Sequence, residues 1–400
     1  MWNEIQLKQA LCDELRNILH YWAEHTVDTA NGGFVGRIDG RNKIHVDAPK
    51  GAVLNARILW TFSAGYGFFG DDKYLKLADR AFVYIRDHFV DPDYGGLFWM
   101  VDARGEVLDA KKQIYALAFC IYGLSEYYAV AKQPEALRLA LGLYDVIENH
   151  SRDKDRGGYL EAFARDWSPA EDVRLSEKDA NERKTMNTHL HIVEAYANLY
   201  KVCPSDRLKT NISDLLMLFH RHFIHPKKYH LKLFFDEQWK EGKKLVSYGH
   251  DIEAAWLLQQ CAELIREEES ITLFRQYAIK IADAAMEGLD EDGGLWYEYD
   301  VERGELVAEK HWWPQAEAVV GFFNAWELSG DANYLNAAMN AWLFINDQII
   351  DWEGGEWYWG VRKDYSVMEN EDKAGVWKCP YHNSRACIEV LRRRNTIING

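Results

Sequence analysis

The stretch SYGHDIEAAWLL, residues 247–258, places a histidine and two carboxylates at the start of an apolar helix. His250 and Glu253 are three residues apart and therefore share one face of that helix. Acidic residues are favourable near a helix N-terminus, but no histidine is needed there. The stretch is open to three interpretations: a helix cap, part of a metal site, or half of an acid–base pair. Asp251 lies one step along the helix, which turns it away from that face.

Two further apolar helices begin with histidine. KTMNTHLHIVEAY carries His189 and His191, and VWKCPYHNSRACIEV carries His382. His191 is four residues after Asn187 and shares its face, so we expect these two side chains in the site and His189 in a structural role. The remaining residues of interest at helix starts are Arg57 in APKGAVLNARILW, Tyr115 in KKQIYALAF, Trp313 and Glu317 in HWWPQAEAVVGF, and Trp377 and Arg385 beside His382.

Three imidazoles at one site suit proton transfer beside a carbonyl group, because an ordinary histidine pKa near 6.5 allows the ring both to take and to give a proton. Two histidines on opposite faces of a carbon can remove a proton from one side and return it on the other, which is epimerisation. Arg57 and His191 are suited to hold the enediolate oxygen that forms. Glu253 is open to two roles, the partner that fixes the His250 tautomer or a charge favourable to the helix dipole.

Two other chemistries compete with this interpretation. Three histidines can bind zinc, but these come from three distant segments with no HExxH motif or close pair, so we expect no metal. A carboxylate pair for glycoside hydrolysis can be drawn from Asp251, Glu253, Glu317 and Asp179. That pair would leave the three histidines unexplained.

The elements that carry these residues belong to a repeat. A Gly-Gly pair followed by aromatic residues recurs five times, and the first glycines are 63, 62, 136 and 61 residues apart. The long interval spans two periods, and the segment KKYHLKLFFDEQW, residues 227–239, stands where the missing pair would lie. The chain therefore contains six units of roughly 62 residues, which indicates an array of supersecondary units.

Each unit shows the same order of elements. An amphipathic helix such as residues 72–89 precedes the Gly-Gly turn, then come a short aromatic hairpin and a polar loop, and a more apolar helix such as residues 113–130 closes the unit. Six helix pairs can close into a ring with the apolar helices inside. We predict an all-α chain, residues 1–400, that forms a single (α/α)6 barrel with short β-hairpins in the connecting loops. The alternative is an open helical solenoid.

A closed ring would bring the candidate site residues together. All six inner helices would run the same way, so their N-termini and the loops before them would meet at one end. Helix dipoles and free N–H groups favour negative charge there, and we expect the pocket at that end.

The composition of the chain indicates which classes of partner it can bind. Aromatic residues make up 14 % of the chain, including 16 Trp, and flat rings of this kind match the C–H face of a sugar. The formal net charge of −16 argues against nucleic acid and anionic membrane as partners. We expect no transmembrane helix, no signal peptide and a cytoplasmic location, with the 6 scattered cysteines as free thiols.

The motifs MNTHLHIVEAY, SYGHDIEAAWLL, WWPQAEAVVGF and WKCPYHN resemble those of the N-acylglucosamine 2-epimerase superfamily and, within it, the cellobiose 2-epimerases. They run in the family's order and, with LNARILW, cover residues 50–390. The resemblance implies an (α/α)6 barrel with no metal or nucleotide cofactor. It implies reversible C2 epimerisation of the reducing-end glucose of a β-1,4-linked disaccharide. We expect the chain to act as a monomer or weak homo-oligomer. The alternatives inside the superfamily are action on N-acylglucosamine or on free mannose.

The resemblance also implies roles for single residues. His250 and His382 become the acid–base pair, His191 assists ring opening or polarises the C1 oxygen, and Arg57 stabilises the enediolate. By the same resemblance, Tyr115 and Asn187 place sugar hydroxyls, and Trp313 and Trp377 stack on sugar rings. Glu253 is implied as the partner of His250, and Asp179, in the polar loop 168–185, as a contact of the distal sugar.

Overall fold

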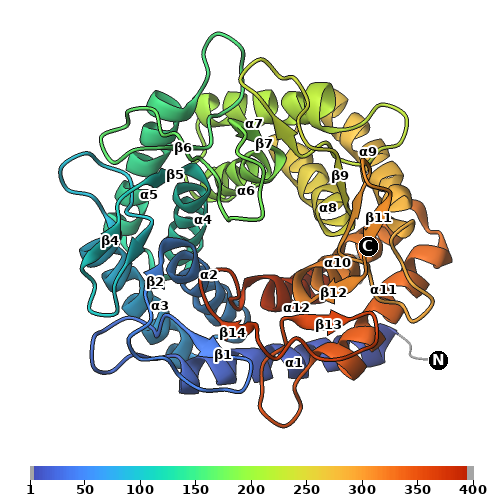
Figure 1. Cartoon of the computed structure of the whole chain (residues 1–400), viewed down its shortest axis with the longest axis horizontal. Helices are drawn as coiled ribbons and strands as arrows, with labels where there is room; N and C mark the ends of the chain where they lie inside the picture. Colours follow the sequence, from blue (N-terminus) through green and yellow to red (C-terminus); the bar gives the residue numbers. More distant parts are fainter. Residues whose placement is uncertain (1–3, 394–400) are drawn as a thin grey trace.

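A computed structural model describes residues 4–393, which form two concentric rings of helices (Figure 1). The inner ring consists of α2 (Ala52–Phe69), α4 (Ile114–Ala131), α6 (Met186–Val202), α8 (Tyr248–Ile265), α10 (Trp312–Ser329) and α12 (Tyr381–Arg393). The outer ring consists of α1 (Glu4–His25), α3 (Asp72–Tyr84), α5 (Pro134–Val146), α7 (Asp206–Leu218), α9 (Glu268–Met286) and α11 (Ala332–Phe344).

The inner ring is closed. Each inner helix contacts the next, and α12 returns to contact α2. The closure confirms the (α/α)6 barrel and excludes the open solenoid. All inner helices begin at the same end of the ring, as the repeat predicted.

The two rings differ in burial as their sequences require. The first fourteen residues of α2, 52–65, are all buried, because the helix is covered by its inner neighbours and by the outer ring. Helix α3 buries only one face, carried by Tyr74, Ala78, Ala81 and Phe82. Four outer helices continue into a π-helical turn: η1 (Ile85–Phe89), η2 (Ile147–Ser151), η3 (Phe219–Phe223) and η4 (Ile345–Ile349).

Short strands join neighbouring units. The strand that leads into each inner helix pairs with a strand of the next unit, and the last pair, β14 with β1, joins the sixth unit to the first. These strands are β1 (Ile38–Asp39), β2 (Lys50–Gly51), β3 (Met100–Val101), β5 (Lys112–Gln113), β6 (Ala162–Phe163), β7 (Lys184–Thr185), β8 (Phe234–Phe235), β9 (Leu245–Ser247), β10 (Glu298–Asp300), β12 (Glu309–His311), β13 (Gly360–Arg362) and β14 (Asp372–Ala374). Two further strands extend hairpins outward: β4 (Val107–Asp109) and β11 (Glu305–Val307).

The fourth unit keeps the repeat's turn without its glycines. Gly95 and Gly157 have φ of 72° and 75°, in the left-handed region that favours glycine. The corresponding residue of the fourth unit is Tyr229, which adopts the same conformation with φ of 62°. The backbone bridge that closes the turn is present in both cases, Val90 with Leu97 and Ile224 with Leu231. The turn is therefore set by the surrounding repeat and tolerates a strained residue.

In five units a buried ion pair ties the turn to the strand that leads into the inner helix. Lys50 lies 2.8 Å from Asp28, and only 1 % of the lysine side chain is exposed. The other pairs are Lys112 with Asp91, Lys184 with Asp153, Lys310 with Asp290 and Lys373 with Asp351. The fourth unit has Val246 and His225 at these positions, so both charges are missing together. This joint replacement avoids leaving one buried charge unpaired.

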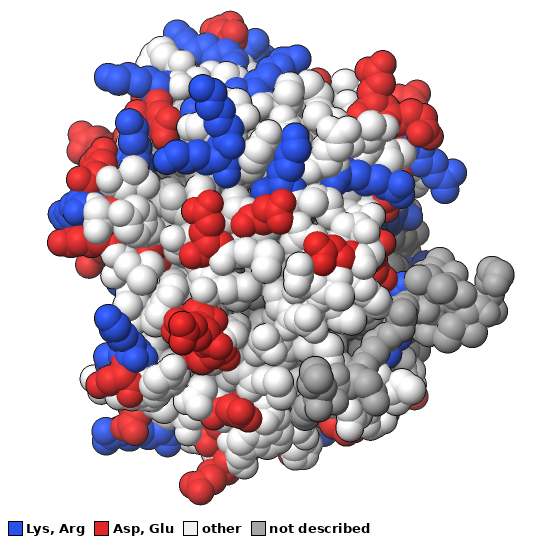
Figure 2. All heavy atoms as spheres, turned by 90° about the vertical axis from the view of Figure 1, so that its right-hand side faces the viewer, with Lys and Arg blue, Asp and Glu red and all other residues white. Residues whose placement is uncertain are grey.

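Helix α4 is long and apolar enough to pass as a membrane span, but 72 % of it is buried inside the protein, where it packs between α2 and α6. All six cysteines are free thiols. On the face viewed in Figure 2, acidic side chains are dispersed and basic ones gather along the upper part. The excess of acidic residues therefore forms no single patch on that face.

The buried pair at Lys50 predicts a large stability effect. We expect Lys50→Met to lower the free energy of unfolding by about 3 kcal/mol, because it leaves the Asp28 carboxylate buried without its partner. Lys73 forms a comparable pair with Glu24 at the surface, with 45 % of the lysine side chain exposed. Lys73→Met is the matched control, and its effect should stay below about 1 kcal/mol. Thermal and denaturant unfolding measure both, and equal effects would contradict the prediction.

Candidate active site

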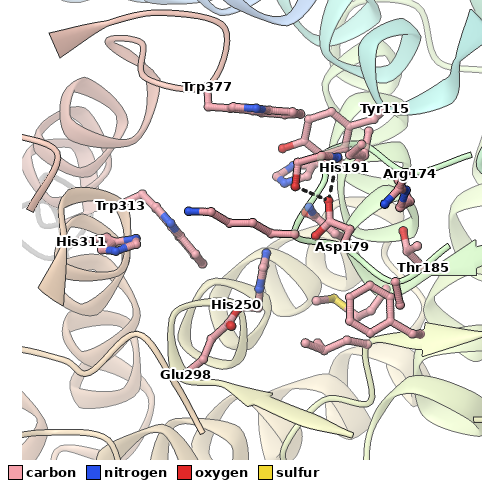
Figure 3. A pocket seen from close by; sticks show the side chains of 18 of the residues that line it. Tyr115, Arg174, Asp179, Thr185, His191, His250, Glu298, His311, Trp313 and Trp377 are labelled. Carbon is pink, nitrogen blue, oxygen red and sulfur yellow. Dashed lines mark hydrogen bonds between the residues drawn. The ribbon is translucent and has the colours of Figure 1, made fainter. Parts of the chain in front are cut away.

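A cavity of about 440 Å³ opens at the end of the ring where the inner helices begin. This volume lies in the range of small-molecule sites. Every residue predicted for the site lines the cavity: Arg57, Tyr115, Asp179, Asn187, His191, His250, Glu253, Trp313, Trp377 and His382. Figure 3 shows Trp377, Trp313, His250, His191 and Tyr115 arranged around the cavity. The helix starts of all six units therefore contribute to one pocket.

Four histidines line the cavity, and one of them, His311, lies with its Nε2 2.8 Å from Glu309. The other three, His191, His250 and His382, are anchored in the same way. In each, Nδ1 has a close partner: Ser247 Oγ at 2.8 Å from His250, Glu317 Oε1 at 2.7 Å from His382, and Glu194 Oε2 at 2.8 Å from His191. Within residues 4–393 no hydrogen bond is formed by Nε2 of these three rings. Each imidazole is therefore held by one nitrogen and offers the other to the cavity.

His189 is held differently. Its Nδ1 lies 2.7 Å from the Thr185 carbonyl oxygen, and its Nε2 accepts the backbone N–H of Tyr159 at 2.9 Å. With both nitrogens occupied by the protein, His189 has no free position for a substrate. The structure therefore agrees with the structural role expected for it.

Asp251 occupies the corresponding position of α8. Its carboxylate accepts the backbone N–H of Leu231 at 2.7 Å and lies 2.7 Å from Nδ1 of His230. Both His189 and Asp251 thus pin an inner helix to the turn of its own unit. Asp251 points away from the cavity, as expected from its place on the helix.

The predicted partnership of Glu253 with His250 is wrong. Glu253 accepts a hydrogen bond from Arg385 at 2.6 Å, and its carboxylate lies 3.9 Å from Nδ1 of His382. His250 is held instead by Ser247, which precedes the helix. A spacing of three residues puts two side chains on one face of a helix, but it does not make them point at each other. Glu253 reaches across the ring to α12.

The partners of the other two histidines were not predicted. Glu194 and Glu317 hold His191 and His382, and Arg385 donates to both of these carboxylates. Glu194 follows His191 by three residues, so the spacing rule used for Glu253 would have found it. Glu317 belongs to a different helix from His382, and no sequence spacing connects the two.

The surroundings keep the pocket histidines neutral. Burial, together with the nearby His191, lowers the pKa of His250 to about 3. Burial and the positive charges of Arg57 and Arg385 lower the pKa of His382 well below its ordinary value. Burial also lowers the pKa of His191, although Glu194 opposes the shift. Neutral imidazoles with a free Nε2 are competent proton acceptors.

Arg57 supplies a fixed positive charge beside these bases. Its Nη2 donates to the Tyr115 hydroxyl at 2.9 Å, and its guanidinium lies 4.0 Å from the centre of the Phe119 ring. The residue is only 3 % exposed, so its charge is weakly screened by water. A negative charge that develops on a substrate oxygen in the cavity would be stabilised by Arg57.

Two tryptophans form walls around the histidines. The Trp313 ring lies 4.7 Å from the His250 ring and 5.7 Å from the His382 ring, measured between centroids. Trp377 lies on a different side of the cavity from Trp313, with its ring centroid 6.2 Å from that of Tyr115 (Figure 3). Flat apolar faces beside polar groups are typical of sugar sites.

The cavity also contains polar groups. The side-chain oxygen of Asn187 is buried and forms no hydrogen bond within the described residues. Asp179, in the loop that covers one side of the cavity, accepts the backbone N–H and the hydroxyl of Ser176 at 3.0 and 2.9 Å. Asn187 thus lines the cavity with an oxygen that has no protein partner, whereas Asp179 is already partly engaged.

One group of side chains has the spacing of a metal site. Ligand atoms of Glu253, Glu317 and His382 lie within 4.8 Å of one another. However, the Arg385 guanidinium donates to both carboxylates at 2.6 Å. The negative charge that would attract a metal ion is therefore already paired with a protein cation.

Comparisons with known proteins assign the family. The profile of the N-acylglucosamine 2-epimerase family matches residues 32–386. The chain belongs to this family, and it is an isomerase of the epimerase type. It is 49 % identical to a cellobiose 2-epimerase of Bacteroides fragilis over 96 % of this chain and 98 % of that protein.

Solved structures agree. A sugar epimerase from a ruminal bacterium is 37 % identical, with a TM-score of 0.93 over 97 % of this chain and 99 % of that one. A cellobiose 2-epimerase of Bacillus thermoamylovorans is 38 % identical, with a TM-score of 0.91 over 96 % of this chain and 100 % of that one. The inner and outer rings of this epimerase are thus those of its family.

The lowered pKa values predict that His250 and His382 stay neutral at pH 6, where an ordinary imidazole would be mostly protonated. Imidazole ¹⁵N chemical shifts of histidine-labelled enzyme, followed from pH 8 to pH 5, measure this. The two signals are assigned by their loss in His250→Asn and His382→Asn. Titration of either ring near pH 6.5 would contradict the prediction.

Proposed function

We propose that this epimerase catalyses reversible C2 epimerisation of the reducing-end glucose of β-1,4-linked disaccharides. Cellobiose would become glucosyl-mannose, and lactose would become epilactose. The observation that carries the proposal is the set of three pocket histidines, each anchored through Nδ1 with Nε2 free. The near-full-length similarity to a cellobiose 2-epimerase supports the choice of substrate.

Catalysis begins with opening of the sugar ring, because the C2 hydrogen is acidic only beside a free C1 aldehyde. His191 assists this step or polarises the C1 oxygen. A neutral histidine, either His250 or His382, then takes the C2 proton through Nε2. The electron pair of the C–H bond moves into a cis-enediolate, whose charge on O1 is stabilised by Arg57.

The second histidine enters this step as an imidazolium, with protons on both ring nitrogens. It gives its Nε2 proton to the opposite face of C2 and becomes neutral. The electron pair of the enediolate forms the new C–H bond, and the C1 aldehyde is restored. One histidine gains a proton and the other loses one in each turnover, and the negative enediolate favours the protonated form of the imidazole that faces it. Protonation at C1 instead would give a ketose, so slow aldose–ketose isomerisation is an expected side reaction.

The other predicted residues bind the disaccharide. Tyr115 and the free Asn187 oxygen place hydroxyl groups of the reacting sugar. Trp313 and Trp377 stack on the sugar rings. Asp179 contacts the distal sugar from its loop. Glu253 belongs to the network behind His382: its carboxylate lies 3.9 Å from Nδ1 of that ring and accepts a hydrogen bond from Arg385.

The remaining proposals concern the whole chain. The reaction uses no metal or nucleotide cofactor, since the two bases and Arg57 supply every step. We propose a single catalytic domain that works in the cytoplasm as a monomer or weak homo-oligomer, with neither nucleic acid nor membrane as partner. The net charge of −16 supports the last point.

Exchange at C2 tests the reaction directly. Cellobiose incubated with the enzyme in deuterium oxide should lose its C2–H signal in proton NMR while a mannose anomeric signal appears. Unchanged spectra would overturn the proposal. Release of glucose would indicate a hydrolase, and faster turnover of N-acetylmannosamine or free mannose would indicate another activity of the family.

We expect His250→Asn and His382→Asn each to reduce turnover by at least about a thousandfold, because each removes one of the two proton carriers. His220→Asn is the matched control, since His220 lies on the outer ring and contacts the Tyr277 hydroxyl. Circular dichroism establishes that the variants fold. Turnover within tenfold of wild type in either pocket variant would remove that histidine from the mechanism.

A further inference from the structure

Arg385 is the centre of a buried network that the reaction steps above do not use. It is 1 % exposed, and its Nη2 donates to Glu253 and Glu317, each at 2.6 Å. Its Nη1 contacts Glu194 and the Tyr381 hydroxyl. One guanidinium thus pairs with three carboxylates, which come from three other inner helices.

Two of these carboxylates hold pocket histidines. Glu194 lies 2.8 Å from Nδ1 of His191, and Glu317 lies 2.7 Å from Nδ1 of His382. The third, Glu253, holds no imidazole at hydrogen-bonding distance. Arg385 therefore reaches the histidines of two different units through their partners.

The charge state of these carboxylates decides the histidine tautomer. An ionised carboxylate can only accept, so it requires N–H at Nδ1 and leaves the lone pair at Nε2. A protonated carboxyl group can donate to Nδ1, and the ring then carries its proton at Nε2. In that second form Nε2 faces the cavity without a lone pair and cannot take a proton from the substrate.

Three buried carboxylates would not stay ionised without a cation. Burial raises the pKa of Glu194, but Arg385 and the hydrogen bonds from His191 and Tyr381 outweigh it and bring that pKa to about 2. Glu317 accepts hydrogen bonds from two donors, Arg385 and Trp256. Glu253 receives only Arg385, and burial with the adjacent Glu317 raises its pKa to about 8. Burial raises the pKa of Glu317 as well, but Trp256 gives Glu317 a donor that Glu253 lacks, and this favours the ionised form on Glu317 and the proton on Glu253.

We propose that Arg385 is a positioning residue that keeps Glu194 and Glu317 ionised. It thereby fixes both His191 and His382 in the tautomer with N–H at Nδ1 and a free Nε2 lone pair toward the cavity. The consequence for catalysis rests on the proposed epimerisation, but the tautomers themselves do not.

His250 provides an internal comparison. Its Nδ1 partner is the Ser247 hydroxyl, which can either donate or accept and so fixes neither tautomer. Within the described residues neither Ser247 nor His250 contacts Arg385. Loss of the guanidinium should therefore change His191 and His382 and leave His250 as it is.

Histidine tautomers in the substrate-free enzyme test the proposal. Long-range ¹H–¹⁵N NMR spectra distinguish Nδ1–H from Nε2–H, and His191→Asn and His382→Asn assign the signals. In wild type we expect Nδ1–H at both positions. Arg385→Met should convert at least one of the two to Nε2–H, and Arg385→Lys, which keeps the charge, should restore Nδ1–H. Unchanged tautomers at both positions in Arg385→Met would overturn the proposal.

Glu317→Gln is the second variant, which keeps the guanidinium in place if Arg385→Met fails to fold. It should release the tautomer of His382 alone, because Glu194 still holds His191. A wild-type tautomer at His382 in Glu317→Gln would overturn the proposal without reference to Arg385→Met.

Kinetics with cellobiose give the functional readout. Arg385→Met should lower kcat about 100-fold with KM within threefold of wild type, the size expected for loss of a partner that orients a reacting ligand. Arg393→Met is the matched control, because Arg393 lies on the same helix and pairs with Glu327 away from the cavity. A wild-type enzyme without C2 exchange would refute the proposed function, while the tautomer measurements would still decide the role of Arg385.

Discussion

The structure depends on the closure of six apolar helices into a ring. Inner helices such as α2 are too apolar to face water on any side, so they must be covered by two inner neighbours and by the outer layer. Because every unit repeats the same order of elements, closure makes all inner helices run in one direction. Their N-termini then meet at one end, and the polar residues of six distant segments are brought to one cavity.

The buried charges of the repeated turns occur in pairs. Five units carry a buried lysine and aspartate that join the turn to the strand that leads into the inner helix, and the fourth unit has lost both members together. The same requirement acts at the active site, where one guanidinium faces three carboxylates. The turn of the fourth unit also lacks glycine. Its backbone keeps the shape of the repeat because the surroundings determine it.

In the active site, one ring nitrogen of each candidate base is bound by the protein and the other is left for the substrate. Nδ1 of His191, His250 and His382 is engaged by a hydroxyl or carboxylate of the protein, and Nε2 is left for the substrate. His189 has both nitrogens engaged, and it belongs to the scaffold. The engagement of both ring nitrogens by the protein therefore marks His189 as a structural side chain, although it lies at the same end of the ring as the candidate bases.

The sequence alone determined the six-unit repeat, the order of its helices and the end of the ring where the pocket lies, because these follow from hydrophobic periodicity and a constant interval. The residues that it indicated for the site all line the cavity, since helix starts can be recognised locally. Only the tertiary structure decided which groups touch each other. Glu253 was paired with His250 on the basis of spacing, but its side chain meets Arg385 and approaches His382. Glu317 and His382 are 65 residues apart, and their contact exists only because the ring brings α10 beside α12. Spacing along a helix reports a shared face, whereas the direction of a long side chain is set by the charges that lie across the ring.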